Sequence, residues 1–113
     1  MSRVFKRAAA RRDLVAHYVY LAENAGDATA DRFLMNAEAS LIDLMEHPDM
    51  GAPVAVRAAA LDGLRKWRVR DFEPFLIFYL GRRDGVSVVR VLHANQDWWH
   101  VLGVIQSSPT SKE

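Results

Sequence analysis

The hydrophobic pattern near the start of the chain predicts a short strand followed by a helix. Val4 and Phe5, flanked by basic residues, predict a short first strand, and the flanking charge suits an edge position in a sheet. From Ala8, apolar residues are spaced three and four apart, which places them on one face of a helix that runs to about Glu23. The chain therefore begins with a strand and an amphipathic helix.

A second amphipathic helix follows after a very short turn. Gly26 is typical of a helix end, and Asp27 is a suitable N-cap for the next helix. Apolar residues at helical spacing continue to Pro48, where the missing backbone N–H and the fixed ring stop the helix. Because the connection is short, we expect the two helices to pair antiparallel.

The pattern in the second half of the chain predicts a sheet. Residues 75–80 are an unbroken run of β-forming apolar side chains, typical of a central strand that is covered on both faces. Residues 64–69 predict the preceding strand, and Pro74 marks the start of the central one. Residues 81–85 hold a turn signal of hairpin length, so residues 86–93 return antiparallel.

These elements predict an α+β fold in the order β-α-α-β-β-β. Two antiparallel helices pack on one face of a small antiparallel sheet, and a short apolar C-terminal segment, residues 98–105, follows the last strand. The link over residues 49–63 is compatible with a helical turn or with an extended path along the sheet. We expect a single domain over residues 1–106 and a disordered tail over residues 107–113.

Helices on one side leave the second face of the sheet to be covered by something else. Tyr79, Val88 and Leu92, together with the central strand, need shelter from water. Three covers fit the pattern: the 98–105 segment folding back, a second copy of the chain, or a different protein laid across the sheet. Burial of apolar area at about 25 cal/mol per Å² would favour any of the three.

Charge is unevenly distributed along the 113 residues, although the net charge is only +1. Residues 1–12 carry five basic and no acidic side chains, and residues 13–63 carry nine acidic and two basic ones. Residues 64–93, the predicted sheet, carry seven basic and three acidic side chains. A basic sheet attracts nucleic acid phosphate or an acidic protein segment. We therefore expect a partner polypeptide to complete the second face.

The amino-acid composition bears on the cellular compartment and on the kinds of site that the chain can form. There is no cysteine, which excludes disulfides and thiolate metal sites and favours a cytoplasmic protein. No apolar run approaches the ~20 residues that span a bilayer. We expect no membrane association, no cofactor and no metal ion.

Basic residues of the sheet and one histidine are the best candidates for catalysis. Basic side chains that hold a phosphate and a histidine that moves protons are the minimum for RNA cleavage through the 2′-hydroxyl. The candidates for the phosphate are Arg65, Lys66, Arg68, Arg70 and Arg90, and the candidate for the proton is His93. A carboxylate that would orient His93 is missing unless Asp97 folds back to it. Gly-rich phosphate loops, paired carboxylates and a nucleophile elbow are absent from the sequence, so we expect a protein that is not an enzyme.

Several short motifs keep a distinctive order and spacing. They are Ala10, Asp13, Leu14, Tyr18, Ala30, Phe33, Leu41, Leu44, Pro48, Gly51, residues 61–65, 75–79 and 89–93, and Asp97. In this order, over about residues 3–100, the chain resembles the ParE branch of the RelE/ParE toxins. The resemblance implies the toxin of a type II toxin-antitoxin module.

The resemblance also implies partners. A ParD-like antitoxin would wrap the toxin with its C-terminal part and form a hetero-oligomer. Its N-terminal ribbon-helix-helix would bind operator DNA, which the toxin would meet only indirectly. ParE toxins are understood to poison DNA gyrase, so we expect inhibition of gyrase by binding. The alternative is a ribosome-dependent mRNA endonuclease like RelE.

Nine residues are the candidates for contacts with the antitoxin or the target. They are Arg65, Arg68, Arg70, Tyr79, Arg90, His93, Asp97, Trp98 and Trp99. Gln96 stands where the closing motif of the ParE branch usually has arginine. If that arginine contacts the target, toxicity is reduced here; if it caps the last strand, Gln96 serves the same purpose.

Overall fold

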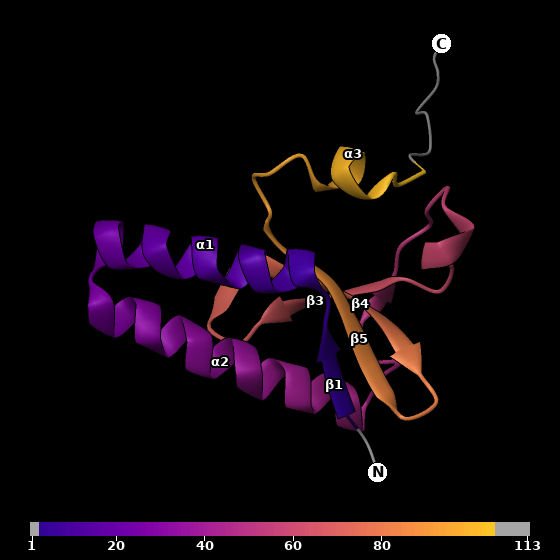
Figure 1. Ribbon diagram of the computed structural model, residues 1–113, viewed down its shortest axis with the longest axis horizontal. Coiled ribbons are helices and arrows are strands. Elements are labelled where there is room, and N and C mark those ends of the chain that lie inside the picture. Colours follow the sequence, from indigo (N-terminus) through magenta and orange to yellow (C-terminus); the bar gives the residue numbers. More distant parts are fainter. Residues whose placement is uncertain (1–2, 106–113) are drawn as a thin grey trace.

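Two long helices form a hairpin along one face of a five-stranded sheet (Figure 1). The computed structural model describes residues 3–105. Helix α1 spans Ala8–Ala25 and helix α2 spans Asp27–Glu46. Gly26 alone joins them, with a φ of 94° that favours glycine. Asp27 is the first residue of α2 rather than its N-cap, which corrects the prediction by one position.

The sheet has the strand order β1-β5-β4-β3-β2. Strand β1 lies at an edge, as predicted, and runs parallel to β5, whereas the other neighbouring strands pair antiparallel. The bounds are Arg3–Lys6 for β1, Ala52–Pro53 for β2, Arg65–Val69 for β3, Phe72–Arg82 for β4 and Gly85–His93 for β5. Strand β2 was not predicted, because two residues are too few to show a period.

The sequence predicted that the central strand starts at Pro74, but β4 begins two residues earlier, at Phe72. The register with β3 shifts here: Arg68 faces Leu76, whereas the next residue, Val69, faces Phe72. Pro74 lies among the extra β4 residues of this irregularity. Its missing N–H therefore interrupts no hydrogen bond to β3, and the proline is tolerated inside the strand.

Gly85 lets β1 approach the start of β5. A Cβ atom at this position would collide with the backbone of Arg3, and the φ of Gly85 is 146°. Next to this contact the Arg3 N–H donates to the Asp84 carbonyl at 2.7 Å. The parallel pairing of β1 therefore begins at the turn of the β4–β5 hairpin.

The helix hairpin and the sheet enclose the larger hydrophobic core, which confirms that both helices cover one face. The fully buried Phe33 of α2 and Tyr79 of β4 lie in it. Its other buried members are Ala10, Leu14, Ala37, Leu41, Leu44, Val69, Phe75, Ile77, Val86, Val88 and Val91.

The chain itself covers the second face of the sheet. The link after α2, with a 3-10 turn at Ala59–Leu61 (η1), and the short helix α3, Trp98–Leu102, lie on the side away from the hairpin (Figure 1). The core between them and the sheet holds Val54, Leu64, Phe78, Leu80, Val89, Leu92 and Leu102. Of the three covers that the sequence left open, the structure selects the segment after β5, joined by the link.

The two covering segments are also bonded to each other. The Arg57 N–H donates to the Gly103 carbonyl at 3.0 Å, and the Ile105 N–H donates to the Ala55 carbonyl at 2.8 Å. The expectation that a partner polypeptide completes this face is therefore wrong. The pairing depends on contacts between segments that are far apart in the chain and have no clear period, so the sequence pattern could not reveal it.

The ends of the predicted domain lie beyond the described part. The predicted disordered tail, residues 107–113, is outside the described residues. Within residues 3–105, no helix combines the length and the hydrophobicity that a bilayer crossing requires.

Candidate functional site

The nine predicted contact residues are spread over the fold instead of forming one site. Strand β3 carries Arg65 and Arg68, the β3–β4 turn carries Arg70, β4 carries Tyr79, β5 carries Arg90 and His93, and the start of α3 carries Asp97, Trp98 and Trp99. Several of their polar groups already have partners within the chain.

Tyr79 and Arg65 hold the loop that follows α2. The buried Tyr79 hydroxyl donates to the Pro48 carbonyl at 2.7 Å and accepts from the Gly51 N–H at 2.8 Å. Burial raises the pKa of Tyr79, because the charged phenolate would lose its hydration. Arg65 donates to the carbonyls of Gly51 at 2.6 Å and Asp49 at 3.2 Å. Both side chains therefore stabilise the path from α2 into β2.

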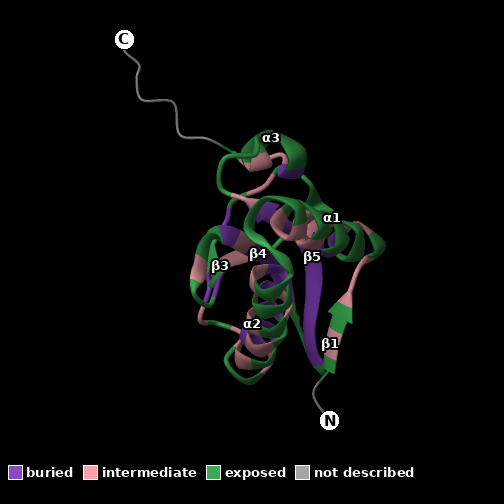
Figure 2. Cartoon of the chain, turned by 90° about the vertical axis from the view of Figure 1, so that its left-hand side faces the viewer, coloured by how far each residue is buried: buried purple, intermediate pink, exposed green. Residues whose placement is uncertain are grey.

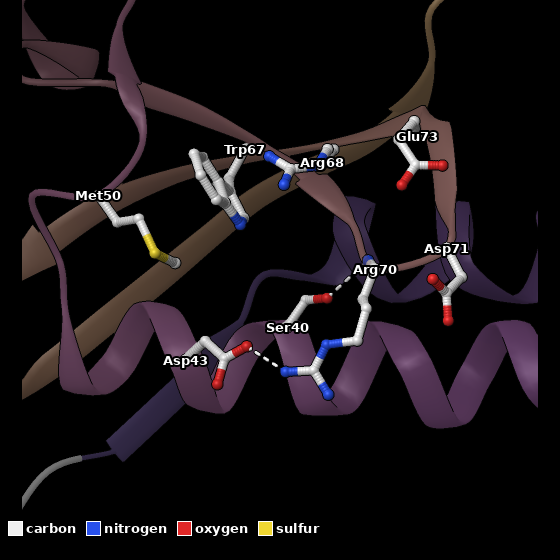
Figure 3. Close-up of a pocket in the computed structure, with 8 residues that line it drawn as sticks. All are labelled: Ser40, Asp43, Met50, Trp67, Arg68, Arg70, Asp71 and Glu73. Atoms are coloured by element: carbon white, nitrogen blue, oxygen red, sulfur yellow. Dashed lines mark hydrogen bonds and ion pairs between the residues drawn. The ribbon is translucent and has the colours of Figure 1, made fainter.

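A cavity of about 250 Å³ lies between α2 and the β3–β4 turn (Figure 3). Arg70 closes one side, since its Nη2 is 2.6 Å from Asp43 Oδ2 and its backbone N–H donates to Ser40 Oγ at 2.9 Å. The Arg68 guanidinium lies 4.6 Å from the centroid of the Trp67 ring, which is a cation–π contact. The cavity is also lined by Met50, Asp71 and Glu73.

The charges of this cavity are nearly balanced. Its two arginines face three carboxylates, those of Asp43, Asp71 and Glu73, so neither an anion nor a cation is strongly favoured. Within the part of the chain that the structure describes, no three histidine, aspartate or glutamate side chains gather in a way that could hold a metal ion. We assign no ligand to the cavity between α2 and the β3–β4 turn.

Arg90 is bound by Asp13 of α1. Its Nε lies 2.7 Å from Asp13 Oδ2 and its Nη2 lies 2.9 Å from Asp13 Oδ1. The hydrogen bonds to this carboxylate raise the pKa of Arg90. The guanidinium is mostly buried in the pair, with 27% of the side chain exposed, so its charge serves the packing of α1 on the sheet.

A second cavity, of about 440 Å³, lies beside α1 and is called the His93 hollow below. It is lined by Ala16, His17, Tyr20, Phe75, His93, Asn95 and Gln96. His93 Nδ1 accepts from the Asn95 N–H at 3.0 Å, so in the neutral ring the proton is on Nε2. The predicted orienting partner, Asp97, makes no side-chain hydrogen bond to this ring within residues 3–105.

His17 forms the inner wall of the His93 hollow. Its Nε2 lies 2.7 Å from the Val91 carbonyl, so this nitrogen is the donor and carries a proton. Burial lowers the pKa of His17, an effect that the hydrogen bond to Val91 partly opposes. The ring also meets Phe75 edge to face, with centroids 4.9 Å apart. The hollow therefore has an aromatic floor and a polar rim.

The two tryptophans of α3 have different environments. Trp98 lies against Phe78, with ring centroids 5.3 Å apart, and Lys66 Nζ is 4.8 Å from the centroid of its indole ring. It is partly buried and packs against the core of the second face. Trp99 contacts Trp98 but keeps 39% of its surface exposed. Of the two, Trp99 is the more exposed.

Sequence reasoning missed the outer face of α1, defined here by Val15, Ala16, Val19 and Tyr20. These residues are exposed although they are apolar or aromatic. The signal was present in the sequence, because apolar residues occupy more positions of this helix than one buried stripe requires. The prediction considered only the stripe that packs on the sheet.

Comparison with known proteins places the chain in a family. The model of the family described as the ParE toxin of type II toxin-antitoxin system, parDE, matches residues 4–98. The chain belongs to the ParE toxin family. A chain in a solved structure of the chromosomal ParDE TA system from P. aeruginosa shares its fold, with a TM-score of 0.64 and 18% identity over 82% of this chain and 96% of that one. No curated protein matches the sequence.

Membership of the ParE family confirms the resemblance seen in the sequence. The matched region ends at Trp98, so most of α3 lies beyond it. Gln96, at the position usually held by arginine, binds back to the last strand: its Oε1 accepts from the His93 N–H at 2.6 Å, and its own N–H donates to the His93 carbonyl at 2.9 Å. In this ParE-family chain Gln96 therefore caps β5.

Proposed function

We propose that this ParE-family toxin inhibits DNA gyrase by binding to it and that a ParD-like antitoxin neutralises it. The family match over residues 4–98 carries the toxin assignment and supports both statements. The toxin and the antitoxin form a hetero-oligomer, and the ribbon-helix-helix part of the antitoxin binds the operator DNA.

The intrachain hydrogen bonds of the basic residues support inhibition by protein binding rather than cleavage of a phosphodiester. Arg90 is engaged by Asp13 and Arg65 by loop carbonyls, so both guanidinium groups are committed to the fold. Phosphate binding would require these contacts to be broken. Exposed apolar groups on α1, in contrast, are suited to a protein partner.

A supercoiling assay tests this proposal. Purified toxin added to gyrase should stop supercoiling, and prior addition of the antitoxin should restore it. Unimpaired gyrase at a stoichiometric excess of folded toxin contradicts the proposal.

One observation favours a second function, cleavage of mRNA. His93 lies at the rim of the His93 hollow, and Nε2 is the ring nitrogen left to exchange protons with a ligand. Transcript ends mapped after induction of the toxin would then show new cuts that the His93→Ala variant does not make. The same cuts in both proteins, or no cuts, argue against this function.

A further inference from the structure

Apolar side chains on the outer face of α1 stay exposed within residues 3–105, although the chain covers both faces of its own sheet. Along the outer face of α1, Val15 is 63% exposed, Val19 is 46% exposed and Tyr20 is 61% exposed. Positions three and four apart lie on the same side of a helix, so Val15 packs next to Val19 and Ala16 next to Tyr20, and the two pairs lie side by side as one stripe along the helix. In Figure 2 much of α1 has the colour of exposed residues.

The His93 hollow continues this stripe toward the sheet. Ala16 and Tyr20 belong to α1 and line it on one side, while Asn95 and Gln96, in the link between β5 and α3, line it on the other. The buried Phe75 is its apolar floor. A partner that lies along α1 therefore finds an apolar ridge with a hollow beside it.

The polar groups at the rim of the hollow favour hydrogen-bond acceptors. Neutral His93 carries its proton on Nε2, because Nδ1 already accepts from the backbone. Gln96 uses Oε1 to accept from the His93 N–H, so its amide NH₂ is the group left for a ligand. A carboxylate or a backbone carbonyl of a partner satisfies both donors.

Positive charge lies at the N-terminal end of the same helix. Arg7, Arg11 and Arg12 are at the start of α1, whose first turn has no acidic residue. Arg7 donates to Ser87 Oγ and Arg11 to the Lys6 carbonyl, both at 3.3 Å. Among the ion pairs of the described residues, none joins these three arginines to a carboxylate. The positive end of the helix dipole adds to this charge.

We infer that the outer face of α1 and the His93 hollow bind an amphipathic segment of a partner protein. The segment is apolar along one side, over Val15, Val19 and Tyr20, and acidic at the end that lies over the α1 arginines. From Arg12 to Tyr20 the helix rises about 12 Å, so two to three helical turns of the partner are sufficient. The inference rests on the proposed function, under which this partner is the antitoxin.

Two paired variants test the inference on the complete chain with a purified ParD-like antitoxin. Val15→Glu/Val19→Glu places two charges in the stripe and should weaken the affinity at least about 100-fold. Met35→Glu/Ile42→Glu is the matched control, because these α2 residues are also exposed, at 70% and 50%, but lie on the other helix. The control should bind like the natural chain, and both variants should keep its melting temperature.

Two further measurements address charge and location. Arg11→Glu/Arg12→Glu should slow association and reduce its dependence on salt, because the partner's acidic end loses its attraction. Hydrogen exchange in the complex should show slower exchange in residues 15–20 and 93–96 than in the free toxin, whereas the outer side of α2 should be unchanged.

The outcomes separate the inference from the proposed function. If the antitoxin binds the natural chain and Val15→Glu/Val19→Glu equally well, the inference is overturned while the antitoxin partnership stands. If sedimentation shows that the free chain is a dimer that the same variant dissociates, and antitoxin affinity is unchanged, the face joins two copies and the inference is also overturned. If the natural chain binds no antitoxin, both fail.

Discussion

Asp13 on α1 and Arg90 on β5 form a two-point ion pair although they lie 77 positions apart in the sequence. The same carboxylate also accepts the Val91 N–H through Oδ2 at 3.0 Å. One side chain of α1 thus satisfies a guanidinium and a backbone donor of the sheet. Burial of the carboxylate, of which 12% is exposed, makes the pair a structural joint between helix and sheet.

Replacing Asp13 by alanine should destabilise the protein by about 2–3 kcal/mol, because it leaves a largely buried guanidinium and a backbone N–H without their acceptor. Urea denaturation measures the change. Asp43→Ala is the control: it breaks the pair with Arg70, which is about half exposed, and should cost less than about 1 kcal/mol. Equal effects of the two substitutions contradict this account of Arg90.

The loop after α2 should depend on the Tyr79 hydroxyl. Tyr79→Phe removes an acceptor from the Gly51 N–H and a donor from the Pro48 carbonyl, and should lower stability by about 1–3 kcal/mol. Thermal unfolding monitors the loss. A melting temperature equal to that of the natural chain means that water replaces the hydroxyl in both bonds.

Gly51 should tolerate no side chain. A Cβ atom there would lie 2.5 Å from Tyr79 Oη and 2.8 Å from the Lys66 carbonyl, so Gly51→Ala should cost more than about 3 kcal/mol. Gly81→Ala is the matched control, because its Cβ would meet only Pro48 at 3.7 Å, and it should change stability by less than about 1 kcal/mol. Chemical denaturation measures the free energy of unfolding of both variants, and equal losses contradict the prediction.

Stability should fall in mild acid because of His17. Burial holds the pKa of His17 below its ordinary value of 6.5, so the unfolded chain binds a proton more readily than the folded one. The stability contributed by neutral His17 is therefore present above the unfolded pKa and is lost as pH falls through and below it. Urea midpoints at about pH 7.5 and about pH 5.5 measure the loss, and the His17→Gln variant should show a smaller difference between them. An unchanged difference assigns the pH dependence to other groups.

The two tryptophans of α3 should respond differently to truncation. Trp98→Ala opens the core of the second face beside Phe78 and should cost about 2–3 kcal/mol, whereas Trp99→Ala should cost less than about 1 kcal/mol. Binding of a hydrophobic dye should rise only for Trp98→Ala. The reverse order would mean that Trp99, not Trp98, seals the sheet.

The sequence by itself determined the helix hairpin, the central strand and the edge position of β1. Each of these depends on a local property: the period of apolar residues, a glycine between two helices, or an unbroken β-forming run. The motifs that resemble ParE toxins also lie in these elements, which is why the family was recognisable before the structure. The predicted starts of β4, at Pro74, and of α2, after Asp27, differ from the observed starts by one or two residues. Strand irregularities and helix starts depend on neighbours in space, so the sequence pattern does not fix them.

Tertiary structure alone decided how the charges and the second sheet face are used. Arg65 and Arg90 looked like free cations in the sequence, yet their acceptors come from residues 14 and 77 positions away. The link after α2 and the segment after β5 have no strong period, and only their pairing over Phe78 and Leu92 shows that the chain closes its own sheet. Contacts between residues far apart in the sequence form only when the chain folds. The structure was therefore needed to show that Val15, Val19 and Tyr20 of α1 stay exposed although the chain covers both faces of its sheet.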